Sequence, residues 1–322
     1  MNSRFKCIKC EDDEIWDKLA SESKQGNLFV KTKFLNSMIY NYECYIVEDC
    51  GVVLCGAVVV IGEDGTPLLG QFPFSQYQGI LFSRSLNDAC YHKSTISQLE
   101  AQNALLSTLY AKYKTLSFSF HYNYSDIRGL QWFNYHNPEE KKFDISVSYT
   151  GLIDLREVVD LQEYMQKVRS VRRSEHRKSI KQKQFTRITN DVQILLDIYE
   201  KTFKRQGMDI AENEISMIRK LAKNAIEMKF GEIRVCYIDE MTASSATLFL
   251  FDENMAYYLI GANDPEYRNT PSGVFCFLES VEAAIQRKCE YIDVCGMNSP
   301  NRADFKLSFN ARPTPYFVAT MQ

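Results

Sequence analysis

The sequence predicts a mixed α/β protein in which two similar halves each have a central mixed sheet flanked by helices. The chain has 322 residues, enough for two domains of ordinary size. Hydrophobic residues make up 45% and aromatic residues 13% of the chain, which suits two cores that contain strands. Both halves have the order helix, helix, strand, strand, strand, helix, strand, short helix, strand. We therefore expect one repeat over residues 1–150 and a second over 151–322.

In the first half, runs with apolar residues at helical spacing alternate with apolar and aromatic runs that are typical of strands. The predicted helices cover residues 12–21, 33–42, 94–112 and 125–132. The predicted strands cover residues 4–10, 43–48, 51–61, 68–74, 76–82, 115–120 and 143–147. Residues 49–51, Asp-Cys-Gly, predict a tight hairpin turn.

The second half follows the same order. Its predicted helices cover residues 161–183, 191–206, 212–229, 273–287 and 301–309. Its predicted strands cover residues 232–239, 243–251, 256–261, 290–295 and 314–320. A local echo supports the duplication, because Cys-Tyr-Ile occurs at 44–46 and again at 236–238, in corresponding strands.

One junction in the second half predicts an anion site. A strand ends near Gly261, a polar turn follows, and a helix begins near Gly273. The first N–H groups of a helix have no partner inside it and can bind phosphate. Arg268, Thr270 and Ser272 belong to this turn and could contribute to such a site. A plain strand-to-helix connection is the alternative.

Composition excludes several classes of protein. The formal net charge of −3 argues against general nucleic-acid binding by the whole chain. The longest apolar run, residues 52–61, is too short to span a bilayer as a helix. The N-terminus lacks the apolar segment of a signal peptide, so we expect a cytoplasmic protein. The ten cysteines lack the spacing of a metal site, and we expect them to be reduced and structural, with no bound metal.

The element order resembles the GNAT acyltransferase fold. Two copies in tandem resemble the Fem-type peptidyl aminoacyltransferases and the GNAT-related acyltransferases of bacterial polysaccharide biosynthesis. The residues that carry the likeness lie mainly around the predicted anion site and near the C-terminus: Gly261-Ala262-Asn263, Arg268, Gly273, Asp293, Gly296, Asp304-Phe305-Lys306 and Phe309. Phe72-Pro73-Phe74 resembles a strand pattern of the first repeat. The turn departs from the usual glycine-rich GNAT pattern, since Pro271 removes one N–H donor.

This resemblance implies transfer of an acyl group from an activated donor, acyl-CoA, to an amine on an amino sugar in polysaccharide biosynthesis. Lys306 matches a lysine near the transferred group, where a cation could stabilise an oxyanion. Asp293 could accept a proton from the acceptor amine, or could cap the following helix. The first half would hold the acceptor, with Lys33, Tyr77 and Gln78 placed there by the resemblance.

Polar residues after the strand over 115–120 add to this predicted acceptor site. His121 could act as a base near neutral pH. Tyr122 and Tyr124 could hydrogen-bond a sugar, or could serve as packing residues.

A basic stretch over residues 167–183 contains eight lysines or arginines and one glutamate. This charge would suit the phosphates of a cofactor, a nucleotide sugar, tRNA or an anionic membrane surface. Two alternatives to the acyl-CoA enzyme therefore remain open. One is a Fem-type transferase that uses aminoacyl-tRNA. The other is a non-catalytic GNAT-fold protein that binds nucleotide sugars or anionic polymers.

Overall fold

The computed structural model describes residues 5–70 and 74–322, and the chain divides into two compact units. Unit 2 comprises residues 149–314, and unit 1 contains the preceding residues together with 315–322. The second repeat was expected over 151–322, whereas unit 2 ends at residue 314 and residues 315–322 belong to unit 1. The last strand, β12 (Arg312–Met321), begins in unit 2 and ends in unit 1.

Unit 1 contains an antiparallel sheet in the order β1-β2-β3-β4. Its strands are β1 (Lys6–Cys10), β2 (Asn41–Asp49), β3 (Val52–Ile61) and β4 (Ile80–Phe82). The predicted hairpin turn joins β2 to β3, with Cys50 and Gly51 both at positive φ. A further strand, β5 (Leu116–Ser119), pairs with the end of β12.

Helices cover both faces of the β3 region. In α1 (Asp13–Glu22), Trp16 packs close to Gly56, where a Cβ would lie 3.0 Å from the indole ring. The neighbouring residues Cys55 and Ala57 point to the other face and pack with the leucines of α4 (Tyr91–Tyr113). The short elements of unit 1 are η1 (Leu28–Val30), α2 (Thr32–Leu35), α3 (Arg84–Asp88) and α5 (Arg128–Gln131).

The strands of unit 2 lie in the order β6-β11-β10-β9-β8-β7. They are β6 (Asp144–Asp154), which begins in unit 1 and continues into unit 2, β7 (Phe185–Thr189), β8 (Gly231–Tyr237), β9 (Ala243–Asp252), β10 (Met255–Asn263) and β11 (Tyr291–Asp293). Neighbouring strands are antiparallel except β10 and β11, which are parallel. The predicted mixed α/β class is therefore confirmed.

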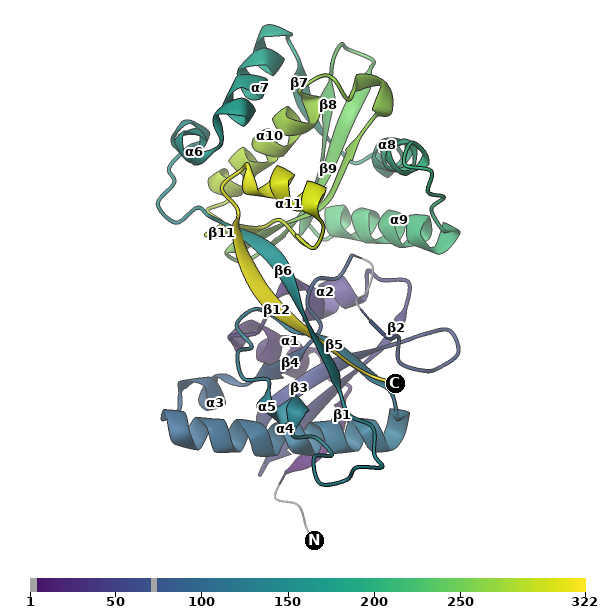
Figure 1. Cartoon of the computed structure of the whole chain (residues 1–322), viewed down its shortest axis with the longest axis vertical. Helices are drawn as coiled ribbons and strands as arrows, with labels where there is room; N and C mark the ends of the chain where they lie inside the picture. Colours follow the sequence, from purple (N-terminus) through teal and green to yellow (C-terminus); the bar gives the residue numbers. More distant parts are fainter. Residues whose placement is uncertain (1–4, 71–73) are drawn as a thin grey trace. The chain divides into compact units, whose positions relative to one another are not determined.

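Helices flank this sheet on both sides (Figure 1). One side carries α8 (Val192–Lys204) and α9 (Glu212–Glu227), which are amphipathic. The other side carries α6 (Leu161–Lys167), α7 (Ser170–Lys181), α10 (Ser272–Gln286) and α11 (Pro300–Leu307). The core on this second side is built from apolar residues of β9, β10, α6 and α10 together with Phe309.

The structure differs from the predicted elements in four places. The single helix expected over 161–183 is two helices, because the chain is extended at Val168 and Arg169. At this break the N–H of Arg169 donates a hydrogen bond to the carbonyl oxygen of Ser308 at 3.0 Å. The edge strand β7 was not predicted. The helix expected over 33–42 is only the four-residue α2. Two strands were expected over 68–82, and the strand described there is β4. Phe72 and Pro73 lie outside the described residues.

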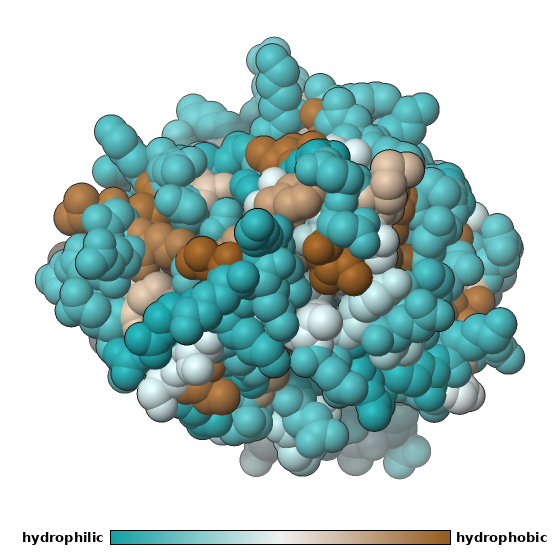
Figure 2. All heavy atoms as spheres, turned by 90° about the horizontal axis from the view of Figure 1, so that it is seen from above, coloured by the Kyte–Doolittle hydropathy of each residue, from teal (hydrophilic) through white to brown (hydrophobic). Residues whose placement is uncertain are grey.

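The face seen from above is mostly hydrophilic, with its hydrophobic residues in small separate groups (Figure 2). This face therefore offers no broad apolar area of the kind that marks a docking surface. Across residues 5–70 and 74–322, none of the helices combines the length and hydropathy that a bilayer crossing needs.

Candidate functional site

The parallel strands β10 and β11 separate after a short pairing. β10 pairs with β11 only from Met255 to Tyr257, opposite Tyr291 to Asp293, and then continues to Asn263. A bulge follows at once in β10, between Tyr258 and Ile260 in the register with β9. The chain leaves the sheet at Asp293, so this carboxylate lies at the point where the two strands diverge.

Asp293 is fully buried at the end of β11. Its carboxylate accepts a hydrogen bond from the hydroxyl of Thr150, a residue of β6, and another from the N–H of Cys295 at 2.8 Å. Buried carboxylates need such donors, so the side chain is held in one orientation. The N-cap residue of α11 is Ser299, so the capping alternative for Asp293 does not apply to this helix.

Lys306, in the last turn of α11, holds the turn that follows Asp293. Its ammonium donates hydrogen bonds to the carbonyl oxygen of Cys295 and, at 2.7 Å, to that of Gly296. Both residues of this turn have positive φ, a conformation that costs free energy at Cys295. The two bonds to the ammonium offset part of that cost.

Burial lowers the pKa of Lys306 to about 8. Cys295 and Asp293 act in the opposite direction and favour the charged form, while Arg302 disfavours it. Burial also raises the pKa of the Cys295 thiol, and so does the negative charge of Asp293. The site therefore presents a lysine that is charged at neutral pH but loses its proton more easily than an exposed lysine.

The predicted anion-site residues lie at the start of α10. Arg268 is exposed at the end of η2 (Pro265–Tyr267), and the Thr270 hydroxyl donates to the Ser272 hydroxyl at 3.0 Å. Pro271 precedes the helix and gives no side-chain cap. A Cβ at Gly273 would lie 2.2 Å from the side-chain oxygen of Asn263, so a larger residue there would require the Asn263 side chain to move. As in any helix, the first N–H groups of α10 have no partner inside the helix, which is the feature that the predicted anion site needs.

Three of the predicted acceptor-site residues lie together in unit 1. The ring of Tyr77 lies 5.0 Å from that of His121 and 5.9 Å from that of Tyr122, edge to face. Gln78 follows Tyr77 and is buried, and Lys33 is half-buried in α2. Tyr124 points elsewhere, because its hydroxyl donates to the side chain of Gln102 at 2.8 Å inside the core of unit 1. The structure thus gives Tyr124 a packing role.

Sequence reasoning missed several residues at these places. Thr150 was not predicted, although it is the hydroxyl partner of Asp293. In unit 1, the Oγ of Ser75, the Nε2 of Gln76 and the Oε1 of Gln78 are buried without a hydrogen-bond partner among the described residues. Buried polar atoms are nearly always hydrogen-bonded, so these three need a further partner such as a water molecule or a ligand. The only sequence signal was the density of glutamines around Tyr77.

His121 is buried, and burial lowers its pKa to about 3. Its Nδ1 accepts a hydrogen bond from the N–H of Asn123 at 3.2 Å. The imidazole is therefore neutral at physiological pH, and the near-neutral titration expected from the sequence does not fit this environment. A neutral imidazole can still accept or donate a hydrogen bond to a ligand.

The pKa of His121 has a measurable consequence for stability. Its folded pKa lies below the unfolded value of about 6.5, so its contribution is complete above pH 6.5 and is lost as the pH falls. Each pH unit below 6.5 should cost about 1.4 kcal/mol from this group. We expect His121→Gln to make the melting temperature fall less steeply between pH 6.5 and 4. The exposed His92→Gln should leave the slope unchanged, and equal slopes for all three proteins would contradict the prediction.

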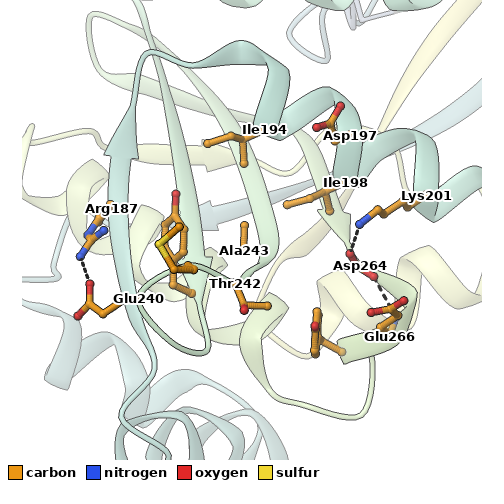
Figure 3. A pocket seen from close by; sticks show the side chains of 13 residues that line it. Arg187, Ile194, Asp197, Ile198, Lys201, Glu240, Thr242, Ala243, Asp264 and Glu266 are labelled. Atoms are coloured by element: carbon orange, nitrogen blue, oxygen red, sulfur yellow. Dashed lines mark hydrogen bonds and ion pairs between the residues drawn. The ribbon is translucent and has the colours of Figure 1, made fainter.

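A cavity of about 520 Å³ lies beside the turn before α10 (Figure 3). Its walls come from α8, the turn between β8 and β9, and residues 264–267, and its charged residues are Arg187, Asp197, Lys201, Glu240, Asp264 and Glu266. Both cations already form ion pairs, Arg187 with Glu240 at 2.6 Å and Lys201 with Asp264 at 2.7 Å. The excess of carboxylates would repel a phosphate-bearing donor, and the predicted anion-site residues do not line this cavity.

The basic stretch forms α7 and divides into two groups of side chains. Arg169 pairs with Asp304 at 3.1 Å, and Arg172 donates to the Ser308 hydroxyl at 2.7 Å, so both contact the end of α11. Of the remaining six cations Arg173 is half-buried, and the others are exposed: Lys167, Arg177, Lys178, Lys181 and Lys183. These exposed side chains could meet a polyanion.

Comparison with known proteins identifies the second unit. Residues 164–307 match a family model described as an acetyltransferase (GNAT) domain. This range includes the start of α10, Asp293 and Lys306. Comparison with curated protein sequences finds no match.

Solved structures share the fold of the whole chain. The crystal structure of FemX has a TM-score of 0.70 and 12% identity, covering 97% of this chain and 96% of the other. A tandem GNAT protein from the clavulanic acid biosynthesis pathway has a TM-score of 0.56 and 11% identity, covering 99% and 98%. L-PGS from Bacillus licheniformis has a TM-score of 0.50 and 8% identity, covering 96% and 91%.

The family match covers the unit that contains the diverging strands, and the structural matches extend the likeness to both units. Within the residues that the structure describes, no group of side chains could hold a metal ion. Residues 164–307 therefore match a GNAT acetyltransferase domain, and the whole chain shares its fold with FemX and with a tandem GNAT protein.

Proposed function

We propose that the protein transfers an acyl group from acyl-CoA to an amine on an amino sugar, in the biosynthesis of a surface polysaccharide. The observation that supports this most strongly lies in unit 2. The phosphate-receptive start of α10 and the Lys306 ammonium belong to packed helices, since the ring of Phe277 in α10 lies 4.4 Å from that of Phe309 just after α11. A site for the donor phosphate and a cation for the reacting carbonyl would thus lie in one domain.

We propose that the amine attacks the acyl group directly, without a covalent enzyme intermediate, so the main requirement is a cation that stabilises the oxyanion. The neutral amine attacks the thioester carbon, an oxyanion forms, and the CoA thiolate leaves and takes the proton that the amine loses. The Lys306 ammonium has three N–H donors. Two of them donate to the carbonyl oxygens of Cys295 and Gly296. We assign the third to the oxyanion. Asp293 then acts through Lys306, because its negative charge favours the charged ammonium.

The acceptor is assigned to unit 1. Tyr77, His121 and Tyr122 supply aromatic faces, and Gln76 and Gln78 supply buried amide atoms without partners among the described residues. Aromatic rings combined with a few polar groups are the usual lining of a sugar site.

Aminoacyl-tRNA is the second candidate for the donor. The outward cations of α7 favour it, because several arginines and lysines on one exposed face suit a phosphate backbone. The shared fold with FemX is compatible with either donor.

The donor can be tested by a thermal-shift titration with acetyl-CoA, longer acyl-CoAs and free CoA. A ligand that binds only the folded protein stabilises it by about 2.7 kcal/mol at a concentration of 100 times Kd. We expect a saturable rise in melting temperature that Arg268→Ala weakens about tenfold in apparent affinity. The exposed Arg84→Ala in unit 1 is the matched control and should bind like the wild type.

A second variant tests the helix start directly. Gly273→Ala would place a methyl group where the Asn263 side chain now lies, so it should displace that side chain toward the helix start and weaken CoA binding. Pairing it with Asn263→Ala, which removes the clash, should restore binding. The absence of any shift with every CoA compound would reject the acyl-CoA donor, and a tRNA-binding assay on variants of Arg177 and Lys178 would then follow.

A further inference from the structure

The side chain of Arg172 lies at the centre of the contact between α7 and the end of α11. Its Nε donates to the Ser308 hydroxyl at 2.7 Å, and its Nη1 pairs with Glu175 at 2.8 Å. Only 17% of the side chain is exposed, which is unusual for an arginine on a basic helix.

The guanidinium of Arg172 also lies over two aromatic rings. Its centre is 5.0 Å from the ring of Phe305 and 5.6 Å from that of Phe309. These rings pack on each other at 5.0 Å and flank Lys306 in the sequence. Cation–π contacts of a desolvated guanidinium are among the stronger ones in proteins.

Backbone contacts reinforce this junction. The break between α6 and α7 turns the N–H of Arg169 toward the carbonyl of Ser308, at 3.0 Å. Ser308 is the C-cap residue of α11 and also donates from its hydroxyl to the carbonyl of Phe305. The last turn of α11, which contains Lys306, is thus fixed from α7.

We propose that Arg172 is a positioning residue for Lys306, and that the basic helix α7 clamps the end of α11 in addition to any polyanion that its outer face binds. This inference rests on the proposed role of Lys306 in the reaction. Without the clamp, the Phe305 ring loses its cover, the last turn of α11 loosens, and the Lys306 side chain gains contact with water.

The charge state of Lys306 reports this change. Burial is the main cause of its lowered pKa, Asp293 and Cys295 raise it, and Arg302 lowers it. Loosening the last turn reduces the burial, so the pKa of Lys306 should move from about 8 up toward the ordinary lysine value of about 10.4.

The test is pulse labelling of lysines with acetic anhydride between pH 6 and 11, with Lys306 quantified by mass spectrometry. The midpoint of the pH–rate curve measures the pKa independently of how accessible the amine is. We expect Arg172→Met to raise the midpoint by at least one pH unit. Arg172→Lys should restore little of it, because lysine lacks the planar fork that both donates to Ser308 and covers two rings.

Arg173→Met is the matched control, since this neighbouring guanidinium contacts only the carbonyl of Gln166, at 3.5 Å, among its described hydrogen bonds. It should leave the midpoint unchanged. If Arg172→Met does not fold, Ser308→Ala removes one acceptor of the clamp and should raise the midpoint by a smaller amount. An unchanged midpoint in a folded Arg172→Met or Ser308→Ala protein would overturn the inference.

The same data separate this inference from the proposed function. A raised midpoint in Arg172→Met, combined with full turnover in Lys306→Ala, would retain the clamp and reject the catalytic role of Lys306. An unchanged midpoint, combined with loss of turnover in Lys306→Ala, would retain the catalytic role and reject the clamp.

Discussion

Replacement of Lys306 by alanine should lower kcat by about 10²- to 10³-fold, the usual cost of losing one oxyanion donor. KM for the donor should change little, because the phosphate site that we propose at the start of α10 does not involve this side chain. The measurement is steady-state product formation, followed by mass spectrometry, with an acyl-CoA and an amino-sugar nucleotide selected on the wild-type protein. Lys223→Ala, which replaces an exposed lysine of α9, is the matched control and should retain full turnover.

The pH dependence gives this prediction a second signature. The acceptor amine must be neutral to attack, so the rate should rise with pH on the acid side. The Lys306 ammonium loses its proton at about pH 8, so the rate should fall again above that pH. Lys306→Arg keeps the charge at all these pH values and should remove the falling limb.

Two outcomes would contradict the role of Lys306. Full turnover in a folded Lys306→Ala protein would remove the residue from the mechanism. A falling limb that persists in an active Lys306→Arg protein would assign that limb to another group. Circular dichroism and the melting temperature confirm that each variant is folded before its rate is interpreted.

The order of elements was predictable because apolar periodicity is a local property of the sequence. The period of α10, the hairpin at Cys50 and Gly51, and the strand that ends in Asp293 all follow from residues close together in the chain. The edge strand β7 escaped prediction because its five residues follow a charged helix and its pattern is too short to distinguish from a loop. The break in the helix at Val168 depends on a bond to Ser308, which no local pattern contains.

The candidate site was predictable only in part, for the same reason. Lys306 and Asp293 were found through the resemblance, but the bonds from Lys306 to the carbonyl oxygens of Cys295 and Gly296 depend on how α11 folds back onto the turn after β11. Thr150 belongs to a strand more than a hundred residues earlier, so its bond to Asp293 arises from sheet order alone. The sequence showed that the stretch is basic, but it did not show that Arg169 would pair with Asp304 or that Arg172 would donate to Ser308.

Replacement of Asp293 by alanine should have the largest effect on stability. The carboxylate is fully buried and accepts from the Thr150 hydroxyl and from the N–H of Cys295, so its removal leaves two buried donors without partners. It also removes a negative charge that favours the charged form of Lys306. A buried donor that loses its partner costs about 1–3 kcal/mol, and since two donors lose theirs we expect a loss of about 2–6 kcal/mol in urea denaturation.

The isosteric variant separates hydrogen bonding from charge. Both bonds go to the Oδ1 atom, so the amide oxygen of Asp293→Asn can still accept them, and its loss of stability should be smaller than that of Asp293→Ala. Both variants remove a charge that raises the pKa of Lys306, so the labelling midpoint of Lys306 should move below about 8, opposite to its movement in Arg172→Met. A midpoint that stays at about 8 in Asp293→Asn would show that burial alone sets the pKa of Lys306. Turnover of Asp293→Asn distinguishes two roles of Asp293. If Asp293 accepts the proton, turnover of the variant should remain low even at a pH where Lys306 is fully charged. If Asp293 acts through Lys306, lowering the pH should restore the rate of the variant relative to that of the wild type.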